Sequence, residues 1–230
     1  MRIAVIGAGV VGSGLARVFL AAGHSVVISS RHPDRAAKVA AEIGAQTVPS
    51  NREAATGADL IVLAVPSTAI AGIADELYGV VEGTIVVDPT NPLLPDLSGL
   101  VPAEASVAEE IPVLMPGAIV VKAFNTLLGK RITDPVVDGV RLDGLYAGDD
   151  DAAKATVREL IAVAGFRPID VGPLALARTL EHMGLLNVSL NARYGWPWNP
   201  AGSCSARPAD RPPRRNQVIG GCRPGGTAQP

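Results

Sequence analysis

The pattern of apolar and polar positions divides most of this chain into short strands and amphipathic helices. Short continuous aliphatic runs, typical of strands buried on both faces, alternate with Ala- and Leu-rich stretches of helical period. We expect strands at Ile3–Ile6, Val26–Ser29, Thr47–Val48, Leu60–Val65, Thr84–Asp88, Ile119–Ala123, Gly144–Ala147 and Pro168–Val171. We expect helices at Val10–Ala22, Asp34–Ile43, Ser67–Tyr78, Ser106–Leu114, Asp151–Ala164 and Pro173–Tyr194.

This order of elements predicts an α/β fold with a Rossmann-type, doubly wound parallel sheet. We expect three parts: a first domain over residues 1–142, a small βαβ and helical extension over 143–198 that covers a substrate, and a tail over 199–230. The tail is rich in Pro and Gly and has no apolar periodicity, which favours disorder. A truncation, a cloning scar or a shifted reading frame is the alternative explanation of the tail.

Composition and charge narrow the possible functions. Hydrophobic residues make up 48% of the chain, which is enough to bury a core. The net charge of −2 does not suggest a nucleic-acid partner. The tail after residue 200 carries five arginines and one acid, which leaves 15 basic and 21 acidic residues before it. Cys204 and Cys222 both lie in the tail, so the body has no disulfide framework or thiolate metal site. Without a leader pattern or a long apolar run, we expect a cytoplasmic protein with no membrane contact.

A glycine-rich loop follows the first expected strand and opens the first expected helix. Its sequence is Gly7-Ala8-Gly9-Val10-Val11-Gly12, and the strand–loop–helix context gives the G-x-G-x-x-G spacing its meaning. The first glycine permits a tight turn, the second lets the backbone approach a pyrophosphate, and the third allows close packing of helix on strand. The pattern predicts a dinucleotide-binding domain over residues 1–142, with a plain strand–helix turn as the alternative.

The end of the second expected strand indicates which dinucleotide is bound. An NAD-selective site has an acid there, which would repel the extra phosphate of NADP. This chain has Ser30, a hydroxyl donor, followed by Arg31, whose planar guanidinium suits a phosphate group. Arg35, one helical turn further on, offers a second cation. The sequence therefore predicts NADP(H), although a solvated role for Arg31 stays open.

Three loops at the carboxyl ends of strands carry small polar groups beside the expected path of the nicotinamide: Ala64–Ser67, Asp88–Pro92 and Lys122–Thr126. Ligands of doubly wound sheets bind in the crevice outside these ends. Simpler explanations are available: Ser67 as a helix N-cap, Asn91 as a turn former and Lys122 as a solvated surface charge.

Six segments, in this order and spacing, resemble the NADPH-dependent reductase family of the deazaflavin coenzyme F420. The resemblance covers about residues 1–198, and the family is in turn similar to the cofactor domain of pyrroline-carboxylate reductases. After Trp196 the chain departs from the short closure that the family has there. The six segments are Gly7–Gly12, Ser30–Arg31, Asp88–Pro92, Lys122–Thr126, Ala147–Asp150 and Asp170–Arg178.

The resemblance implies an NADP-dependent oxidoreductase with coenzyme F420 as co-substrate, usually a homodimer. It implies that the 172–195 helix and the Asn125–Thr126 loop cover the deazaflavin, that Gly7, Gly9 and Gly12 hold the pyrophosphate and that Ser30, Arg31 and Arg35 hold the adenosine phosphate of NADP(H), with Ala64–Ser67 beside its nicotinamide half. The implied cofactor contacts are Gly7, Ala8, Gly9, Val10, Val11, Gly12, Ser30, Arg31, Arg35, Ala64, Val65, Pro66, Ser67, Asn91, Ala123, Asn125 and Thr126.

Acid–base candidates are scarce, and we assign neither a catalytic residue nor a metal ligand. His24 is expected to be structural and His32 solvated, whereas His182 either packs in the last helix or faces the second substrate. Hydride exchange between two bound rings depends mainly on positioning, so this scarcity fits the resemblance. Two alternatives stay open: an NADPH-dependent imine, ketone or flavin reductase, and a non-catalytic NADP(H)-sensing protein.

Overall fold

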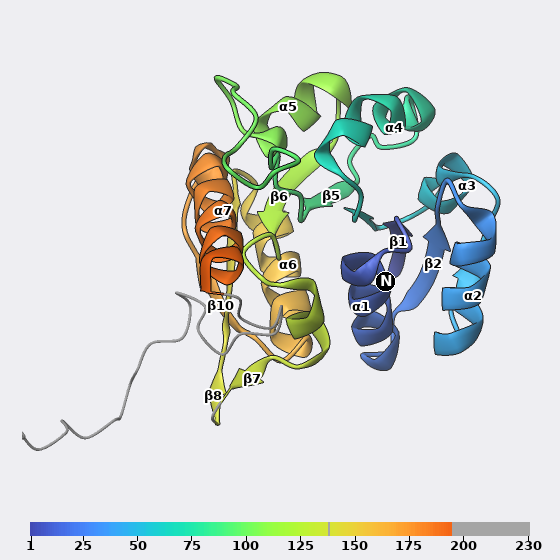
Figure 1. The fold of residues 1–230 in the computed structure, drawn as a ribbon. Helices are drawn as coiled ribbons and strands as arrows, with labels where there is room; N and C mark the ends of the chain where they lie inside the picture. The colour runs from blue at the N-terminus through green and yellow to red at the C-terminus, as the bar shows by residue number, and fades with distance from the viewer. Residues whose placement is uncertain (138, 195–230) are drawn as a thin grey trace, which may run out of the picture.

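The fold, seen in a computed structural model that describes residues 1–137 and 139–194, is built around one eight-stranded sheet. The spatial order of its strands is β10–β9–β6–β5–β4–β1–β2–β3 (Figure 1). Within the described residues, its neighbouring strands are parallel except for β6 and β9. The bounds are β1 Arg2–Ile6, β2 Ser25–Ser29, β3 Gln46–Thr47, β4 Leu60–Leu63, β5 Ile85–Asp88, β6 Ile119–Ala123, β9 Asp143–Gly148 and β10 Arg167–Asp170. The predicted α/β, Rossmann-type fold is therefore confirmed.

Helices cover both faces of this sheet. One face is covered by α1 (Val10–Ala21), α2 (Pro33–Ile43) and α6 (Asp151–Val163). The other is covered by α3 (Asn51–Ala55), α4 (Ile70–Leu77), α5 (Val107–Leu114) and the start of α7 (Ala177–Tyr194). The described residues also contain three short 3-10 helices: η1 Ser67–Ala69, η2 Gly129–Thr133 and η3 Leu174–Leu176.

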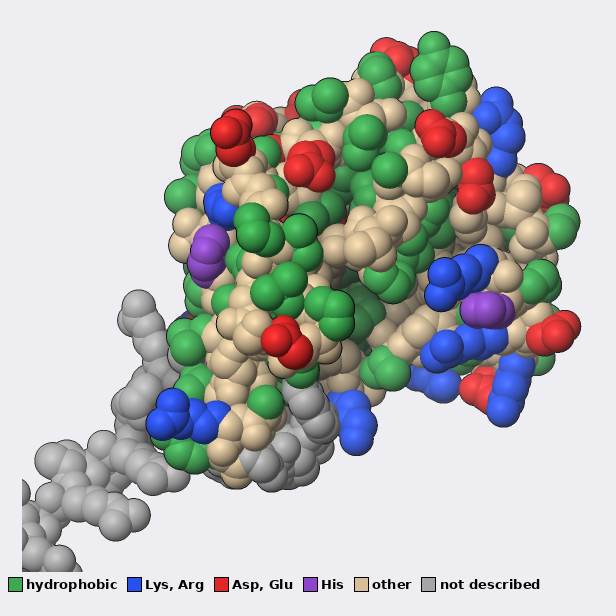
Figure 2. Space-filling view, turned by 45° about the horizontal axis from the view of Figure 1, so that its top comes forward, with side chains coloured by type: hydrophobic (Ala, Val, Ile, Leu, Met, Phe, Trp, Pro, Cys, Tyr) green, Lys and Arg blue, Asp and Glu red, His purple; other side chains and the backbone are tan. Residues whose placement is uncertain are grey.

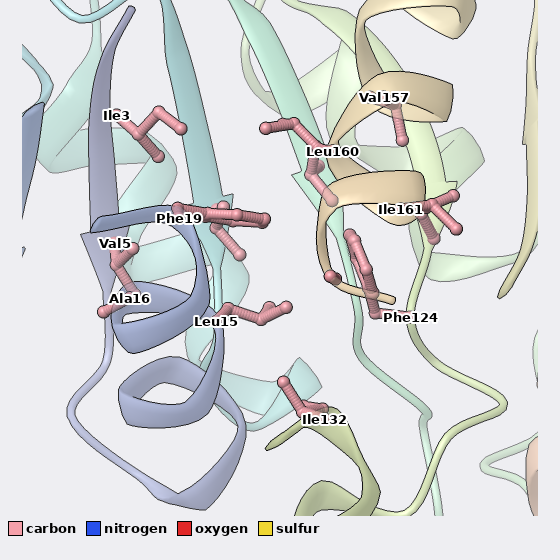
Figure 3. Packing of buried hydrophobic residues seen from close by; sticks show 14 of the residues in the cluster. Ile3, Val5, Leu15, Ala16, Phe19, Phe124, Ile132, Val157, Leu160 and Ile161 are labelled. Atoms are coloured by element: carbon pink, nitrogen blue, oxygen red, sulfur yellow. The ribbon is translucent and has the colours of Figure 1, made fainter. Parts of the chain in front are cut away.

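Alternate residues of the central strands enter two separate cores. On β1, Ile3 and Val5 lie beside α1, as Figure 3 shows, in a core that also contains residues of α6, whereas Ala4 and Ile6 pack on the α4 side. All four are buried, and so is the whole of β4. Full burial of each aliphatic side chain stabilises the fold by roughly 1.5–3 kcal/mol. The continuous apolar runs of the sequence thus arise because these strands have helices on both faces.

The last part of the sheet is the βαβ-like piece predicted for it, with β9 and β10 parallel and α6 between them, but this piece runs against the direction of β6. β9 pairs antiparallel with β6, and only β10 runs parallel to β9. A parallel neighbour needs a long crossover, but η2 and a hairpin of β7 (Val136–Val137) and β8 (Val140–Arg141) connect β6 to β9. The chain therefore reverses direction there. Neither this hairpin nor α3 is predicted from the sequence, and several predicted element ends lie one to three residues away from those observed.

The carboxyl ends of β1, β2, β4, β5 and β6 share one edge of the sheet, with α7 packed beside β9 and α5. Residues from Asp143 onward add β9 and β10 to the same sheet, so the boundary at residue 142 stays a prediction. The tail predicted over 199–230 lies outside the described residues. No helix of the described chain is long and apolar enough to span a membrane.

Candidate dinucleotide-binding site

A pocket with a volume of about 530 Å³ lies at the carboxyl ends of β1, β2 and β4. The glycine loop, the β2–α2 segment and α4 with the loop before it form its three sides. In Figure 2, basic side chains gather around a histidine on one side of the face that is shown. The pocket is lined by Ile6, Gly7, Ala8, Gly9, Ser30, Arg31, His32, Arg35, Asn51, Ala64, Val65, Pro66, Thr68, Ala69, Gly72, Ile73 and Glu76.

The three glycines of the loop are required for different reasons. Gly7 has a φ of +113°, which L side chains rarely adopt, and a Cβ there would collide with the Ala64 carbonyl oxygen. A Cβ at Gly12 would collide with the Gly7 carbonyl oxygen, so Gly12 permits the close approach of helix and loop. A Cβ at Gly9 would meet no atom within 4 Å and would instead occupy open space in the pocket. Gly7 and Gly12 therefore shape the fold, and Gly9 leaves room for a ligand.

The first turn of α1 points its amides at this space. Gly9 is the N-cap, and within the described chain no side chain caps this end of the helix. The Ser13 hydroxyl donates to the Gly9 carbonyl oxygen at 2.7 Å, so it occupies an acceptor and leaves the amides available. Uncapped amides together with the helix dipole make an anion site suited to a pyrophosphate.

The β2–α2 segment gives the pocket a basic side. Ser30, Arg31, His32 and Arg35 line it, and all except the half-buried Ser30 are exposed. The His32 amide donates to the Ser30 hydroxyl oxygen at 3.2 Å, which orients this hydroxyl and leaves its proton for a ligand. Two guanidiniums and a hydroxyl near the end of β2 suit the phosphate that NADP(H) carries on its adenosine ribose. They suit the unphosphorylated ribose of NAD(H) far less well.

Asn51, Thr68 and Glu76 are polar residues of the pocket that were not predicted from the sequence. Asn51 opens α3, and Glu76 lies on α4, with Asn51 Nδ2 donating to Glu76 Oε2 at 2.8 Å. The spacing of Ser50 and Glu53 is a capping-box pattern that could have indicated α3, and Ser50 does accept from the Glu53 amide. The helical spacing of Ala69, Gly72, Ile73 and Glu76 could have indicated one common face on α4.

A buried ionic cluster lies further along the same edge of the sheet. The Lys122 ammonium donates to Asp88 Oδ2 at 2.7 Å, to the Thr90 carbonyl oxygen at 2.7 Å and to Glu181 Oε1 at 2.9 Å. The Lys122, Asp88 and Glu181 side chains are all fully buried. Burial raises the pKa of the Glu181 carboxyl, and the Lys122 ammonium opposes that rise. The alternative of a solvated surface charge at Lys122 was wrong, because its partners come from β5 and α7.

Asparagines join α7 to the loops after β5 and β6. Asn91 Nδ2 donates to the Asn125 carbonyl oxygen at 2.8 Å, and Asn125 Nδ2 donates to Asn91 Oδ1 at 2.9 Å and to the Leu180 carbonyl oxygen at 2.9 Å. Asn187 Nδ2 donates to the Thr126 carbonyl oxygen at 2.9 Å. Buried acceptors without a hydrogen-bond partner among the described residues lie here too: Thr90 Oγ1, Asn125 Oδ1, Thr126 Oγ1, Glu181 Oε2 and Asn191 Oδ1.

Phe124 sets the direction of the loop after β6. Its φ is +64°, an uncommon conformation for a bulky residue, and the side chain is buried against Phe19 with ring centroids 6.2 Å apart. Such a conformation persists only where the surroundings enforce it, and it often occurs at functional sites. Here it turns the chain so that Asn125 and Thr126 meet α7.

The predicted cofactor contacts fall into two groups. Those that line the pocket are Gly7, Ala8, Gly9, Ser30, Arg31, Arg35, Ala64, Val65 and Pro66. Those outside its lining are Val10, Val11, Gly12, Ser67, Asn91, Ala123, Asn125 and Thr126. The first three of these lie in the first turn of α1, Ser67 opens η1, and the last four lie at the ends of β5 and β6. Their contacts with a cofactor stay predictions.

The histidines and acids offer no metal site in the described residues, where no group of three metal-binding side chains occurs. His24 packs edge-on against Phe19, with ring centroids 6.4 Å apart, and partial burial lowers its pKa. His182 is exposed on α7, with Nδ1 2.8 Å from the Arg178 carbonyl oxygen.

Comparison with known proteins points to one family. Residues 2–92 match the family described as NADP oxidoreductase, coenzyme F420-dependent. An F420-dependent NADP reductase of Methanothermobacter thermautotrophicus is 33% identical over 214 residues, which cover 84% of this chain and 90% of that protein. Metalloreductase STEAP3 of Rattus norvegicus is also 33% identical, over 80% of this chain, but this chain spans only 36% of that protein's length.

Solved structures show the same likeness. A protein from Arthrobacter sp. FB24, described as an F420-dependent NADP reductase, has a TM-score of 0.72 at 31% identity and covers 85% of this chain and 95% of its own. An imine reductase from Bacillus cereus has a TM-score of 0.64 at 20% identity, covering 84% of this chain and 62% of its own. At that identity the imine reductase shows a shared fold only.

Proposed function

This chain belongs to the coenzyme F420-dependent NADP oxidoreductase family, and on that premise we propose that it transfers hydride between NADPH and the deazaflavin coenzyme F420. The main support for this proposal is the length of the match to the Methanothermobacter reductase. The Methanothermobacter reductase aligns over 84% of this chain and 90% of its own length, so the likeness is not confined to the dinucleotide-binding part. A homodimer in the cytoplasm stays part of the expectation.

The pocket fits NADP(H) at both phosphate positions. The uncapped amides of α1 suit the pyrophosphate. Because Gly9 has no Cβ, the space beside it is free for this group. Ser30, Arg31 and Arg35 would hold the adenosine phosphate through charge-assisted hydrogen bonds. No acid takes the place of Ser30, so nothing at the end of β2 repels that phosphate.

We expect the second ring system at the edge of the sheet beyond the pocket. Because β5 and β6 follow β4 in the sheet, a nicotinamide that passes Ala64–Pro66 is directed toward the loops after them. The buried atoms Asn125 Oδ1 and Thr126 Oγ1, which have no hydrogen-bond partner among the described residues, lie on the second of these loops. Such groups suit the imide and hydroxyl donors of a deazaflavin.

The side chains of this site position ligands and exclude water. When bound, NADPH supplies the hydride, and the deazaflavin takes it up together with one proton from solution. The first turn of α1 and the Ser30–Arg35 segment fix the dinucleotide at its phosphates. Lys122 anchors α7 through Glu181, which makes the helix a rigid wall beside the loops after β5 and β6. No side chain is required as an acid or base.

An acceptor screen tests this proposal. Purified protein is mixed with NADPH and, in separate reactions, with coenzyme F420, FMN or a cyclic imine, and NADPH oxidation is followed by absorbance. We expect turnover with coenzyme F420 that exceeds turnover with the other two by at least about a hundredfold, since the remote parts of the correct substrate contribute to its positioning. Faster reduction of FMN or the imine would assign that activity instead. Tight NADPH binding without any turnover would favour the sensing function.

A further inference from the structure

Glu76 has no role in binding the phosphate groups of a dinucleotide. It lines the pocket from α4, whereas Arg31, His32 and Arg35 line it from the β2–α2 side. A carboxylate in a pocket for a multiply charged anion opposes binding by like-charge repulsion. Its presence is explained if the carboxylate accepts a hydrogen bond from a neutral, donating part of the ligand.

One hydrogen bond holds this carboxylate directly and two more support it, although the residue is exposed. Asn51 Nδ2 donates to Glu76 Oε2 at 2.8 Å, and the hydroxyl of the fully buried Ser29 donates to Asn51 Oδ1 at 2.8 Å. Arg52 Nη1 donates to the Glu76 carbonyl oxygen at 3.1 Å and so fixes the backbone of this turn. The chain from Ser29 to Asn51 to Glu76 thus links the sheet to the carboxylate.

The wall beside Glu76 is suited to a flat ring. Ala69, Gly72 and Ile73 precede it on the same face of α4 and line the pocket. A Cβ at Gly72 would meet no atom within 4 Å, so the backbone of α4 is open to a planar group at this point. The part of NADPH that is flat, neutral and bears an N–H donor at this end of the molecule is the adenine.

We propose that Asn51 and Glu76 form a base-recognition subsite that selects adenine. Glu76 accepts from the exocyclic amine of the base, and the second amide hydrogen of Asn51 donates to the ring nitrogen N7 beside that amine, which accepts in adenine and in hypoxanthine alike. A single asparagine can recognise an adenine edge with its own amide donor and acceptor. Here Asn51 supplies the donor and Glu76 supplies the acceptor. The proposal rests on the NADPH binding contained in the proposed function and is independent of the deazaflavin.

The pattern rejects a base with the opposite polarity. Hypoxanthine carries a carbonyl oxygen where adenine carries the amine, so it presents an acceptor to the Glu76 carboxylate. Two acceptors that face each other lose a hydrogen bond and repel. Nicotinamide hypoxanthine dinucleotide phosphate has the same phosphates, riboses and nicotinamide as NADPH, which makes it the matched probe.

Fluorescence titration of the full chain with reduced NADPH and with the reduced hypoxanthine analogue measures this selectivity as a ratio of two Kd values. For the wild type we expect NADPH to bind about tenfold more tightly, as a good pair of base contacts allows. For Glu76→Gln we expect the two Kd values to agree within about twofold, because the amide group can accept from the amine or donate to the carbonyl oxygen. Removing the negative charge affects both ligands alike, so the ratio isolates the base.

Asp75→Asn is the control, since the neighbouring exposed acid on α4 does not line the pocket. It removes the same charge and should leave the wild-type ratio unchanged. An equal affinity of the wild type for both ligands, or an unchanged ratio in Glu76→Gln, overturns the proposal. So does a Glu76→Gln variant that alters the preference for NADPH over NADH while it keeps the base ratio, because Glu76 would then act on the phosphate side. These binding ratios stand whether or not coenzyme F420 is reduced.

Discussion

Lys122 on β6 and Glu181 on α7 lie 59 residues apart in the chain, and their Nζ and Oε1 atoms are 2.9 Å apart inside the protein. Asp88 and the Thr90 carbonyl oxygen complete the surroundings of the ammonium. Removing charges from water costs several kcal/mol for each ion, so the cluster is stable only while every charge keeps its partners. The position of α7 beside the candidate site therefore depends on this pair.

Replacing the central cation should destabilise the protein severely. Lys122→Met leaves Asp88 and Glu181 buried without a counter-charge, and we expect a loss of about 3–5 kcal/mol in the free energy of unfolding. Lys38→Met, at an exposed position on α2, should change it by less than about 0.5 kcal/mol. Denaturant titration of both variants measures the difference. Similar losses in the two variants would show that the buried cluster contributes little.

Protonation of Glu181 should be visible in the pH dependence of stability. Its folded-state pKa is raised, so above about pH 4.3, where an unfolded glutamate titrates, the folded protein binds more protons than the unfolded chain. The free energy of unfolding then falls as the pH rises from about 4.3 toward the raised pKa. Glu181→Gln removes this fall.

We therefore expect the stability of Glu181→Gln relative to the wild type to increase between about pH 4 and about pH 7. Thermal or denaturant unfolding at several pH values measures this difference, in which groups common to both proteins cancel. Glu159→Gln, at an exposed position on α6, should show no such trend. A parallel pair of curves for Glu181→Gln and the wild type would contradict the raised pKa.

The glycines of the loop should separate fold from binding. Gly9→Ala adds a Cβ in open space at the N-cap of α1, so we expect the thermal midpoint to fall by no more than a few degrees, roughly, and NADPH affinity to fall at least about tenfold. Gly12→Ala adds a Cβ against the Gly7 carbonyl oxygen, and we expect it to destabilise the fold by about 1–3 kcal/mol or more. Thermal unfolding and NADPH titration of both variants provide the comparison. A Gly9→Ala protein that binds NADPH normally would exclude the pyrophosphate from this turn.

The basic side of the pocket should distinguish the two nicotinamide dinucleotides. Arg31→Ala removes a charge-assisted phosphate contact. We expect the affinity for NADPH to fall roughly tenfold to hundredfold and the affinity for NADH to change little. Arg158→Ala, at an exposed position on α6 outside the pocket, serves as the control. Titration with both ligands measures the effect. Equal losses for NADPH and NADH would remove Arg31 from the phosphate site.

The features predictable from sequence are those that local patterns determine. The buried run of β4, the glycine loop after β1 and the Ser30–Arg31 pair at the end of β2 follow from strand burial and from fixed offsets along the chain. Lys122 was harder to interpret, because nothing near it in sequence shows that Asp88 and Glu181 would enclose it. Asn51 and Glu76 meet only through the packing of the short α3 on α4, which no periodicity reveals. The direction of β9 depends likewise on a hairpin connection rather than on its own residues.

The transfer of labelled hydride tests the central claim most directly. The protein is mixed with coenzyme F420 and NADPH that carries deuterium at the position from which hydride is transferred. We expect the label to appear in the reduced deazaflavin in stoichiometric amount and not to exchange into solvent, because the two rings react in contact and no side chain relays a proton. Label in the water, or an unreduced deazaflavin in the presence of bound NADPH, would contradict this claim.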